Sequence, residues 1–230
     1  MPSHSLDVLA FLDPVVPPKL VAWAEDWSPS SVPAAPRASA SVILCRDVAG
    51  GDAVARGLET YLLHRHDRMR FAASMAVFPG GGLDPADRTA ADPLLACALR
   101  ETREETGVDL AAEALVPWAH WTTPEIQPIR YDTSFYLAVL PAGQLAQDTS
   151  SETASAGWVT PSDAVNAYRA GSLQLMPPTL SILLELAELP SVAAAIEVGR
   201  DRVIEPVLPR VVREAVGWVF RYPQPGSGDD

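Results

Sequence analysis

The sequence has few cysteines, few basic residues and no long apolar run, and each shortage excludes a class of protein. Only Cys45 and Cys97 are present, and their spacing fits neither a disulfide framework nor a cysteine metal site. Lysine and arginine total 17 against 29 aspartates and glutamates, for a net charge of -12. Because surfaces that bind nucleic acid are normally basic, nucleic acid is not expected as a partner. No apolar run approaches the length of a membrane span, so no membrane association is expected.

The remaining composition is that of a globular protein. With 230 residues, of which 48% are hydrophobic, the chain can form one domain with a sizeable core. We expect a proline-rich N-terminal extension over residues 1–36, a main domain over 37–222 and a disordered tail over 223–230. No lysine or arginine precedes Lys19, so no export signal is evident. Together with the two unpaired cysteines, this favours a cytoplasmic location.

Local patterns predict strands and helices that alternate along the main domain. Apolar, partly alternating segments predict strands at 38–46, 58–65, 76–78, 114–122, 133–140 and 157–159. Asp92 and Pro93 are typical of a helix start, and Gly107 of a helix end, so a helix is expected over 93–106. Further helices are expected to begin at Thr160 and to span 179–188. The mixed connections favour an α/β protein, an α/β/α sandwich around a mixed β-sheet.

The helix at 93–106 carries an unusual concentration of acid. With 3.6 residues per turn, Glu101 lies one turn before Glu104 and Glu105, so the three carboxylates share a face. Such like charges repel, and they become favourable when a hard divalent cation such as Mg²⁺ binds them. An acidic helix considered alone is more often a solvated surface with ion pairs to nearby arginines. The sequence motifs before and within this helix favour the metal-binding interpretation.

Two stretches resemble the Nudix box, whose pattern ends in R-E-U-x-E-E-x-G-U. Phe-Pro-Gly-Gly occupies 78–81, and Arg-Glu-Thr-Arg-Glu-Glu-Thr-Gly-Val occupies 100–108. The second stretch matches every fixed position, and Thr102 is a departure at the first apolar position. By this resemblance the chain is identified as a member of the Nudix hydrolases, which cut diphosphate linkages with the help of metal ions.

The resemblance implies roles for the matching residues. Glu104 and Glu105 would be ligands of Mg²⁺ or Mn²⁺, and Glu101 would be a ligand or the base that activates water. Arg100 would orient these carboxylates by ion pairing, and the carbonyl of Gly81 would contribute to the metal site. Water would then attack one phosphorus of a nucleoside diphosphate linked to another group.

The first half of the box departs from the family pattern. Asp92 stands where the family has a glutamate, and Gly81 lies about five residues further from Arg100 than the pattern requires. Asp92 is therefore either a supporting catalytic residue or only the helix cap. The family often uses a further acid outside the box as base, for which Glu152 and Glu125 are candidates.

The long loop after the glycine turn resembles a branch that includes the peroxisomal coenzyme A diphosphatases of animals. A coenzyme A signature upstream of the turn is matched in part, at Leu62, Arg65, Arg70 and the Phe-Pro-Gly-Gly stretch; it is not matched at Leu63, His66 and Ser74. Arg65 and Arg70 are candidates for binding substrate phosphates, since arginine forks suit phosphate oxygens. The alternative is that these arginines only keep the surface soluble.

The expected substrate is a nucleotide-derived small molecule, with coenzyme A or acyl-coenzyme A preferred. ADP-ribose, NADH and dinucleotides are alternatives, and so is a non-catalytic Nudix-like module that only binds a ligand. Apolar segments within 179–220 are compatible with a homodimer. Histidine metal sites are not expected, because the histidines lack the spacing of metal ligands. Three aromatic residues could either stack on a nucleobase or pack in the core: Trp118, Trp121 and Tyr131.

Overall fold

A mixed β-sheet forms the centre of the computed structural model, which describes residues 8–12, 14–28, 30–48, 57–65, 75–149 and 153–223. Its main path runs β3-β2-β1-β6-β5-β8, with β4 paired to β1 and β7 paired to β2. The strands are β1 (Arg37–Asp47), β2 (Leu58–Arg65), β3 (Ala76–Val77), β4 (Gly80–Gly82), β5 (Val116–Thr122), β6 (Tyr131–Val139), β7 (Thr153–Val159) and β8 (Pro206–Val207). The β1–β6 and β5–β8 pairs are parallel and the others antiparallel.

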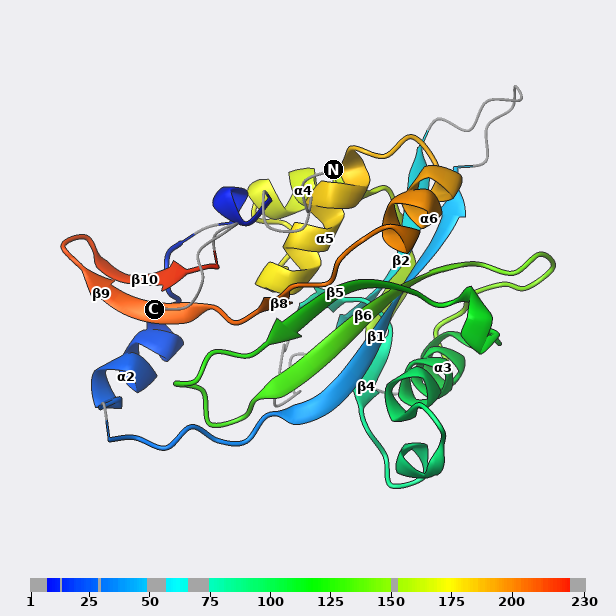
Figure 1. The fold of residues 1–230 in the computed structure, drawn as a ribbon. Coiled ribbons are helices and arrows are strands. Elements are labelled where there is room, and N and C mark those ends of the chain that lie inside the picture. Colours follow the sequence, from blue (N-terminus) through cyan, green and yellow to red (C-terminus); the bar gives the residue numbers. More distant parts are fainter. Residues whose placement is uncertain are drawn as a thin grey trace.

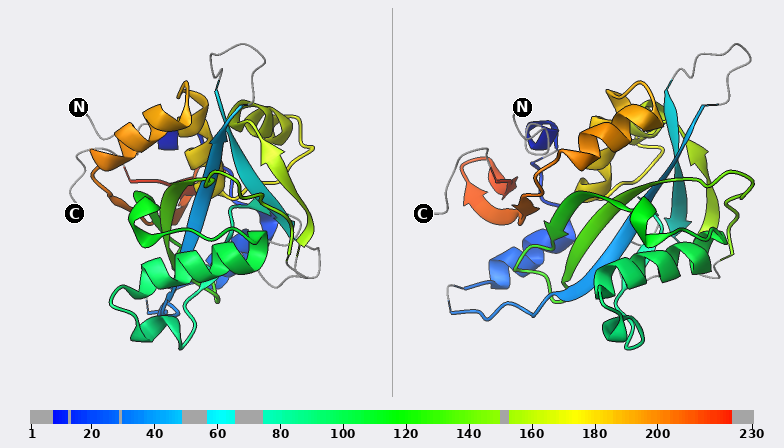
Figure 2. Two further views of the ribbon diagram at one scale, coloured as in Figure 1. Left: turned by 90° about the vertical axis from the view of Figure 1, so that its right-hand side faces the viewer. Right: turned by 45° about the vertical axis from the view of Figure 1, so that its right-hand side comes forward.

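Helices cover both faces of this sheet (Figure 1). One face carries α3 (Pro93–Thr106), and the other carries α4 (Pro161–Arg169), α5 (Pro177–Ala187) and α6 (Val192–Arg200), as Figure 2 shows. Alternating residues of β1 enter two separate cores: Val42 and Leu44 pack on the α3 side, and Ile43 and Cys45 on the side of α4 to α6. This alternation follows from the two-residue period of a strand. The predicted α/β/α sandwich around a mixed sheet is confirmed.

Strand β1 changes partner along its length, and this creates the place where the acidic helix meets the sheet. Its second half pairs with β2 from Cys45 to Asp47, whereas its first half pairs with β4 from Ser39 to Ser41. The short strand β3 pairs with β2 and not with β1. Because β1 and β2 diverge, the Phe-Pro-Gly-Gly stretch crosses between them, and its glycines lie against β1.

Helix α3 begins and ends where its sequence predicts. The Asp92 carboxylate accepts hydrogen bonds from the backbone amides of Leu94 and Leu95, both at 3.1 Å, and Pro93 occupies the first turn. Gly107 ends the helix in a left-handed conformation with φ of 70°, which costs glycine little. Capping on this scale contributes about 1 kcal/mol at the N-terminus.

The chain before β1 and after α6 adds elements that the sequence analysis does not predict. They are the 3₁₀ helix η1 (Val8–Phe11), helix α2 (Pro18–Asp26) and a hairpin of β9 (Arg210–Glu214) and β10 (Gly217–Arg221). The hairpin and the N-terminal segment are joined: the Phe220 amide donates to the Pro14 carbonyl at 2.7 Å, and Val15 bridges Val219. Further 3₁₀ turns are η2 (Asp87–Thr89) and η3 (Ala112–Ala114). The predicted disordered tail lies outside the described residues except for Pro223.

Helices α5 and α6 are the most apolar of the fold. Within the described ranges, no single helix has the length and apolar character of a membrane span; these two reach that threshold only as a pair bent by 113°. Leu180, Ile182, Leu183 and Leu186 of α5 are buried in the core on that face of the sheet.

A buried ion pair connects the segment after α6 to the core. Arg202 Nη2 contacts both carboxylate oxygens of Glu185, at 2.7 and 2.8 Å, and the two side chains are 4% and 8% exposed. Trp118 Nε1 donates to the same carboxylate at 2.8 Å, and the Arg202 guanidinium lies 4.7 Å from the centroid of the indole ring. Trp118 is fully buried and covered by this cation, so its ring is not available to a nucleobase.

Replacing Arg202 with alanine is expected to lower the free energy of unfolding by about 3–5 kcal/mol, because the buried Glu185 carboxylate loses the positive charge that balances it. Urea unfolding measures this. The matched control is Arg221→Ala, which removes an exposed pair with Glu214 and is expected to cost about 0–1 kcal/mol. Equal losses in the two variants would contradict the assignment.

Candidate active site

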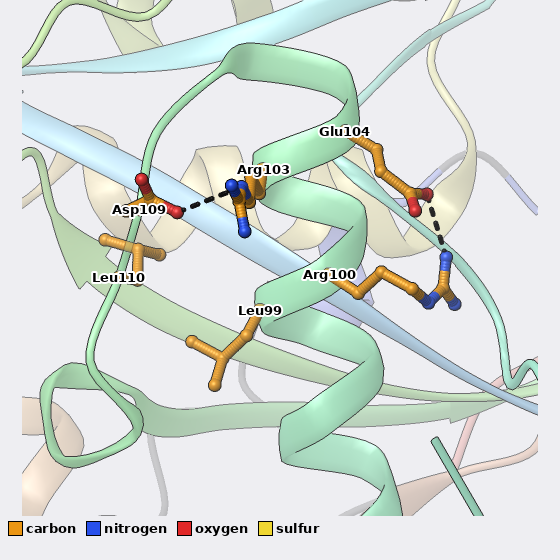
Figure 3. Close-up of a pocket in the computed structure, with 6 residues that line it drawn as sticks. All are labelled: Leu99, Arg100, Arg103, Glu104, Asp109 and Leu110. Atoms are coloured by element: carbon orange, nitrogen blue, oxygen red, sulfur yellow. Dashed lines mark hydrogen bonds and ion pairs between the residues drawn. The ribbon is translucent and has the colours of Figure 1, made fainter. Parts of the chain in front are cut away.

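The Arg100 guanidinium is the centre of the acidic cluster on α3. Its Nη1 donates to Glu101 Oε1 and to Glu104 Oε2, both at 2.9 Å. Its Nη2 donates to Asp87 Oδ2 at 2.8 Å and to the Gly82 carbonyl at 3.1 Å. One cation thereby holds three carboxylates and the end of the glycine strand, and Figure 3 shows its contact with Glu104.

Asp87 is a member of this cluster that the sequence analysis does not identify. It lies in η2, within the loop that is longer than the family pattern, and its side chain is 4% exposed. The hydrogen bonds from Arg100 hold the pKa of the Asp87 carboxyl below its usual range. Its position 13 residues before Arg100 follows no helical or strand period, so no local pattern marks it.

Glu101 and Glu105 face the glycine strand β4. Glu105 Oε2 accepts a hydrogen bond from the Gly80 amide at 2.8 Å, which fixes that carboxylate. A Cβ at Gly81 would overlap the Glu101 carboxylate, and one at Gly80 would overlap Ser41 and the carbonyl of Ala40. Gly81 therefore allows β4 to approach the helix closely, and Gly80 allows it to approach β1.

The electrostatics differ among the carboxylates. Burial raises the pKa of Glu101 above its usual range, although the Arg100 charge opposes the rise. Glu104 is 58% exposed and faces solvent. Burial also raises the pKa of the Cys97 thiol, which donates to the Gly81 carbonyl at 3.5 Å. Glu101 is therefore half-buried, whereas the Glu104 carboxylate on the next turn of the helix is exposed.

The donor set suits a hard divalent cation. Carboxylate oxygens of Glu101 and Glu104 both lie 2.9 Å from one Arg100 nitrogen, so the two carboxylates are close to each other, and oxygen ligands of this kind suit Mg²⁺. Across the described ranges no three histidine, cysteine, aspartate or glutamate side chains are already gathered closely enough to hold a metal. Binding of a metal would therefore require these side chains to turn away from Arg100.

The other predicted site residues lie at different places. Asp92 caps α3 and Glu125 is exposed in the loop between β5 and β6, at the end of the sheet where Arg37 pairs with Tyr131. Arg65 is the last residue of β2, and its amide donates to the Met75 carbonyl at 3.0 Å. Arg70 and Glu152 lie outside the described residues.

Two of the aromatic residues considered for stacking a nucleobase, Trp121 and Tyr131, lie in different surroundings. Trp121 is 5% exposed and packs edge-on against Tyr222, so it belongs to the core. Tyr131 differs, because its Cε1 would lie 4.0 Å from a Cβ placed at Gly82. Its ring is therefore beside the glycine strand of the site.

Comparison with known proteins identifies the family of the chain. The sequence model of the NUDIX domain matches residues 36–177. The chain belongs to the NUDIX domain family. A crystal structure of a NUDIX hydrolase from Alicyclobacillus acidocaldarius superposes with a TM-score of 0.62 at 25% identity, covering 71% of this chain and 96% of that one.

Two curated relatives extend the comparison. A Caenorhabditis elegans protein with the name nudix hydrolase 7 is 25% identical over 163 residues, which cover 56% of this chain and 55% of that protein. The acyl-coenzyme A diphosphatase NUDT19 of Gallus gallus is 28% identical over 180 residues, covering 66% of this chain and 47% of the relative. The chain thus spans about half the length of these relatives.

Replacing Asp87 with asparagine is expected to lower the free energy of unfolding at pH 7 by about 1.5–3 kcal/mol, the contribution of hydrogen bonds to a charged group. Because the folded-state pKa of Asp87 is lowered, this stabilisation is present above the unfolded pKa and is lost as pH falls through the folded one. Urea unfolding of both proteins between pH 7 and pH 2.5 should show the gap closing below a pH of about 4. A gap that stays constant to the lowest pH would contradict the ion pair.

Proposed function

We propose that the chain is a metal-dependent hydrolase that cuts the diphosphate linkage of a nucleoside diphosphate joined to another group. The observation that carries this proposal is the convergence of Glu101 and Glu104 on one Arg100 nitrogen beside the glycine strand. Arg100 balances only part of the charge of Glu101, Glu104 and Asp87, so the cluster keeps negative charge that a divalent cation would balance. Membership of the NUDIX domain family supports the same reading.

Glu101, Glu104 and Glu105 would hold Mg²⁺ or Mn²⁺, with the Gly81 carbonyl as a further oxygen. When bound, the metal stabilises the negative charge that develops on the phosphoryl oxygens. Arg100 would keep the carboxylates in place before binding, and Asp87 would keep Arg100 in place from the loop side. The hydrogen bond from the Gly80 amide would hold the orientation of Glu105.

Glu101 is also the carboxylate best suited to take a proton from the attacking water. It is the less exposed of the two carboxylates that contact Arg100 Nη1, and in the metal-free chain burial raises its pKa above the usual range. Glu152 and Glu125 are the alternatives outside the helix. Glu125 lies at the end of the sheet that carries β4 and Tyr131, which keeps it a candidate.

Coenzyme A or acyl-coenzyme A is the proposed substrate, with an adenosine 3′,5′-bisphosphate half and a phosphopantetheine half as products. The partial coenzyme A signature around Arg65 and the resemblance to acyl-coenzyme A diphosphatases of Xenopus laevis and Gallus gallus support this choice. ADP-ribose, NADH and dinucleotides are the alternatives within the same reaction. The alternative to a hydrolase is a non-catalytic module that only binds its ligand.

Changing Glu104 to glutamine is expected to lower kcat by about two to four powers of ten, equivalent to about 3–5 kcal/mol in the barrier, with little effect on folding because the residue is 58% exposed. Turnover at saturating Mg²⁺ measures this. Glu113→Gln, at an exposed glutamate in η3, is the matched control and should leave turnover unchanged. Near-normal turnover in Glu104→Gln would remove Glu104 from the metal site.

A substrate panel tests the substrate. With Mg²⁺ or Mn²⁺, coenzyme A and acetyl-coenzyme A are expected to be cleaved at least tenfold more efficiently, in kcat/KM, than ADP-ribose, NADH or diadenosine polyphosphates. Chromatography of the products identifies the bond that is cut. Cleavage of ADP-ribose with coenzyme A untouched would overturn the substrate, and no metal-dependent turnover on any member would favour the binding module.

A further inference from the structure

Two of the proposed metal ligands, Glu104 and Glu105, lie in the last turn of α3, which ends at Thr106. Helix ends fray, because the last carbonyls of a helix have no partner within it. A carboxylate carried by a frayed turn is poorly placed to bind a cation, so the contacts that hold this turn bear on the metal site. The loop between β6 and β7, described over residues 140–149, reaches this turn.

Three hydrogen bonds from the β6–β7 loop hold the last turn of α3. The Thr149 hydroxyl donates to the Glu104 carbonyl at 2.6 Å, and the Thr149 amide donates to the Glu105 carbonyl at 3.2 Å. The Gln147 amide donates to the Thr106 carbonyl at 3.0 Å. The last three carbonyls of the helix are therefore each bonded to the same loop.

A second attachment holds this loop to the chain beyond the helix end. The Asp109 amide donates to Gln144 Oε1 at 2.8 Å, and Gln144 Nε2 donates to the Asp109 carbonyl at 2.9 Å. Asp109 follows the end of α3, as Figure 3 shows. A Cβ placed at Gly107 would lie 3.8 Å from the methyl carbon of Thr149, so the loop also packs against the residue that ends the helix. The loop thus holds the chain on both sides of this glycine.

The loop contacts the backbone of the two glutamates, whereas other groups contact their carboxylates. Glu104 Oε2 accepts from Arg100 at 2.9 Å, and Glu105 Oε2 accepts from the Gly80 amide at 2.8 Å. Binding of a metal would require Glu104 to leave Arg100. The bonds from Thr149 involve no carboxylate oxygen, so they can persist when the side chains turn toward a metal.

The hydroxyl bond of Thr149 lies at the surface. Water can donate to the Glu104 carbonyl in its place, so loss of the hydroxyl should change the overall stability little. A water molecule, unlike a side chain of the loop, does not hold the turn in one position. The effect of this bond is therefore expected in the placement of the ligands more than in the stability of the fold.

We propose that Thr149 is a positioning residue of the metal site, which acts through the backbone of Glu104 and Glu105. Its hydroxyl keeps the last turn of α3 in the conformation that binds the cation. Without the hydroxyl the turn is frayed in part of the population, and the apparent metal affinity falls in proportion to the fraction that remains competent. The proposal rests on the metal site of the proposed function.

Binding of Mn²⁺ to the full chain without substrate, measured from the electron paramagnetic resonance signal of the free ion, tests this role without any need for turnover. Thr149→Val keeps the shape of the side chain and removes its hydroxyl. It is expected to raise the dissociation constant of Mn²⁺ about two- to fivefold, the effect of losing one exposed hydrogen bond. Thr149→Ser restores the hydroxyl and is expected to bind Mn²⁺ as the unmodified chain does.

The matched control is Thr160→Val. Thr160 Oγ1 accepts from the Asp163 amide at 3.1 Å at the start of α4, on the other face of the sheet. This variant also loses a threonine hydroxyl at a helix end, and its Mn²⁺ affinity should be unchanged. Equal weakening of Mn²⁺ binding in the two valine variants would overturn the positioning role, and so would unchanged binding in Thr149→Val.

Amide hydrogen exchange measured by NMR gives a second readout. Because coupling between two sites is reciprocal, a bound metal must in turn stabilise the loop contacts that favour it. Saturating Mg²⁺ is expected to slow exchange of the Gln147 and Thr149 amides about two- to fivefold, although neither residue is a proposed ligand. The Leu180 amide, bonded to the Met176 carbonyl in α5, should exchange at the same rate with and without Mg²⁺. Unchanged exchange at both loop amides in a chain that binds Mg²⁺ would contradict the coupling.

Failure of the proposed function gives a different result. A chain that binds no Mn²⁺, or that binds it equally well after Glu104→Gln, lacks the proposed metal site. A chain that binds Mn²⁺ through Glu104, with the same affinity in Thr149→Val, lacks only the positioning role of the loop. The two failures are therefore distinguished by the same titration.

Discussion

Mutual repulsion of the carboxylates on α3 is the constraint on which the site depends, and the Arg100 guanidinium is what offsets it. Glu101 and Glu104 would repel by a few tenths of a kcal/mol when exposed, and by more because Glu101 is half-buried. Arg100 contacts both, and it is held in turn by Asp87 and by the Gly82 carbonyl. The Arg100 guanidinium therefore connects the helix, the glycine strand and the loop between them.

The divergence of β1 and β2 makes this arrangement possible. A sheet with uninterrupted pairing between these strands would leave no edge of β1 for the glycine strand. Because β4 fills that edge, a Cβ at Gly81 would overlap Glu101 of the helix, and a Cβ at Gly80 would overlap Ser41 of β1. The requirement for glycine is thus steric, and it arises from the topology of the sheet.

Features governed by neighbours in sequence were predictable, and those governed by distant partners were not. The bounds of α3 follow from Asp92, Pro93 and Gly107, all of which act within one turn of the helix. The placement of Glu101 and Glu104 on one face follows from the helical period. Strand β4, in contrast, exists only because β1 offers it an edge, and three consecutive glycines give no strand pattern. Asp87 joins the site through the path of a long loop, and the β9–β10 hairpin is fixed by Pro14 and Val15, about 200 residues away.

The two cysteines are fully buried, one under each layer of helices, with pKa values of about 12 for Cys45 and about 11 for Cys97. At neutral pH only roughly one thiol in ten thousand, or fewer, is the reactive thiolate. We therefore expect the folded chain to react only slowly with maleimides and similar labels. A cysteine introduced at an exposed position would carry a fluorophore or spin label selectively, without removal of either native thiol.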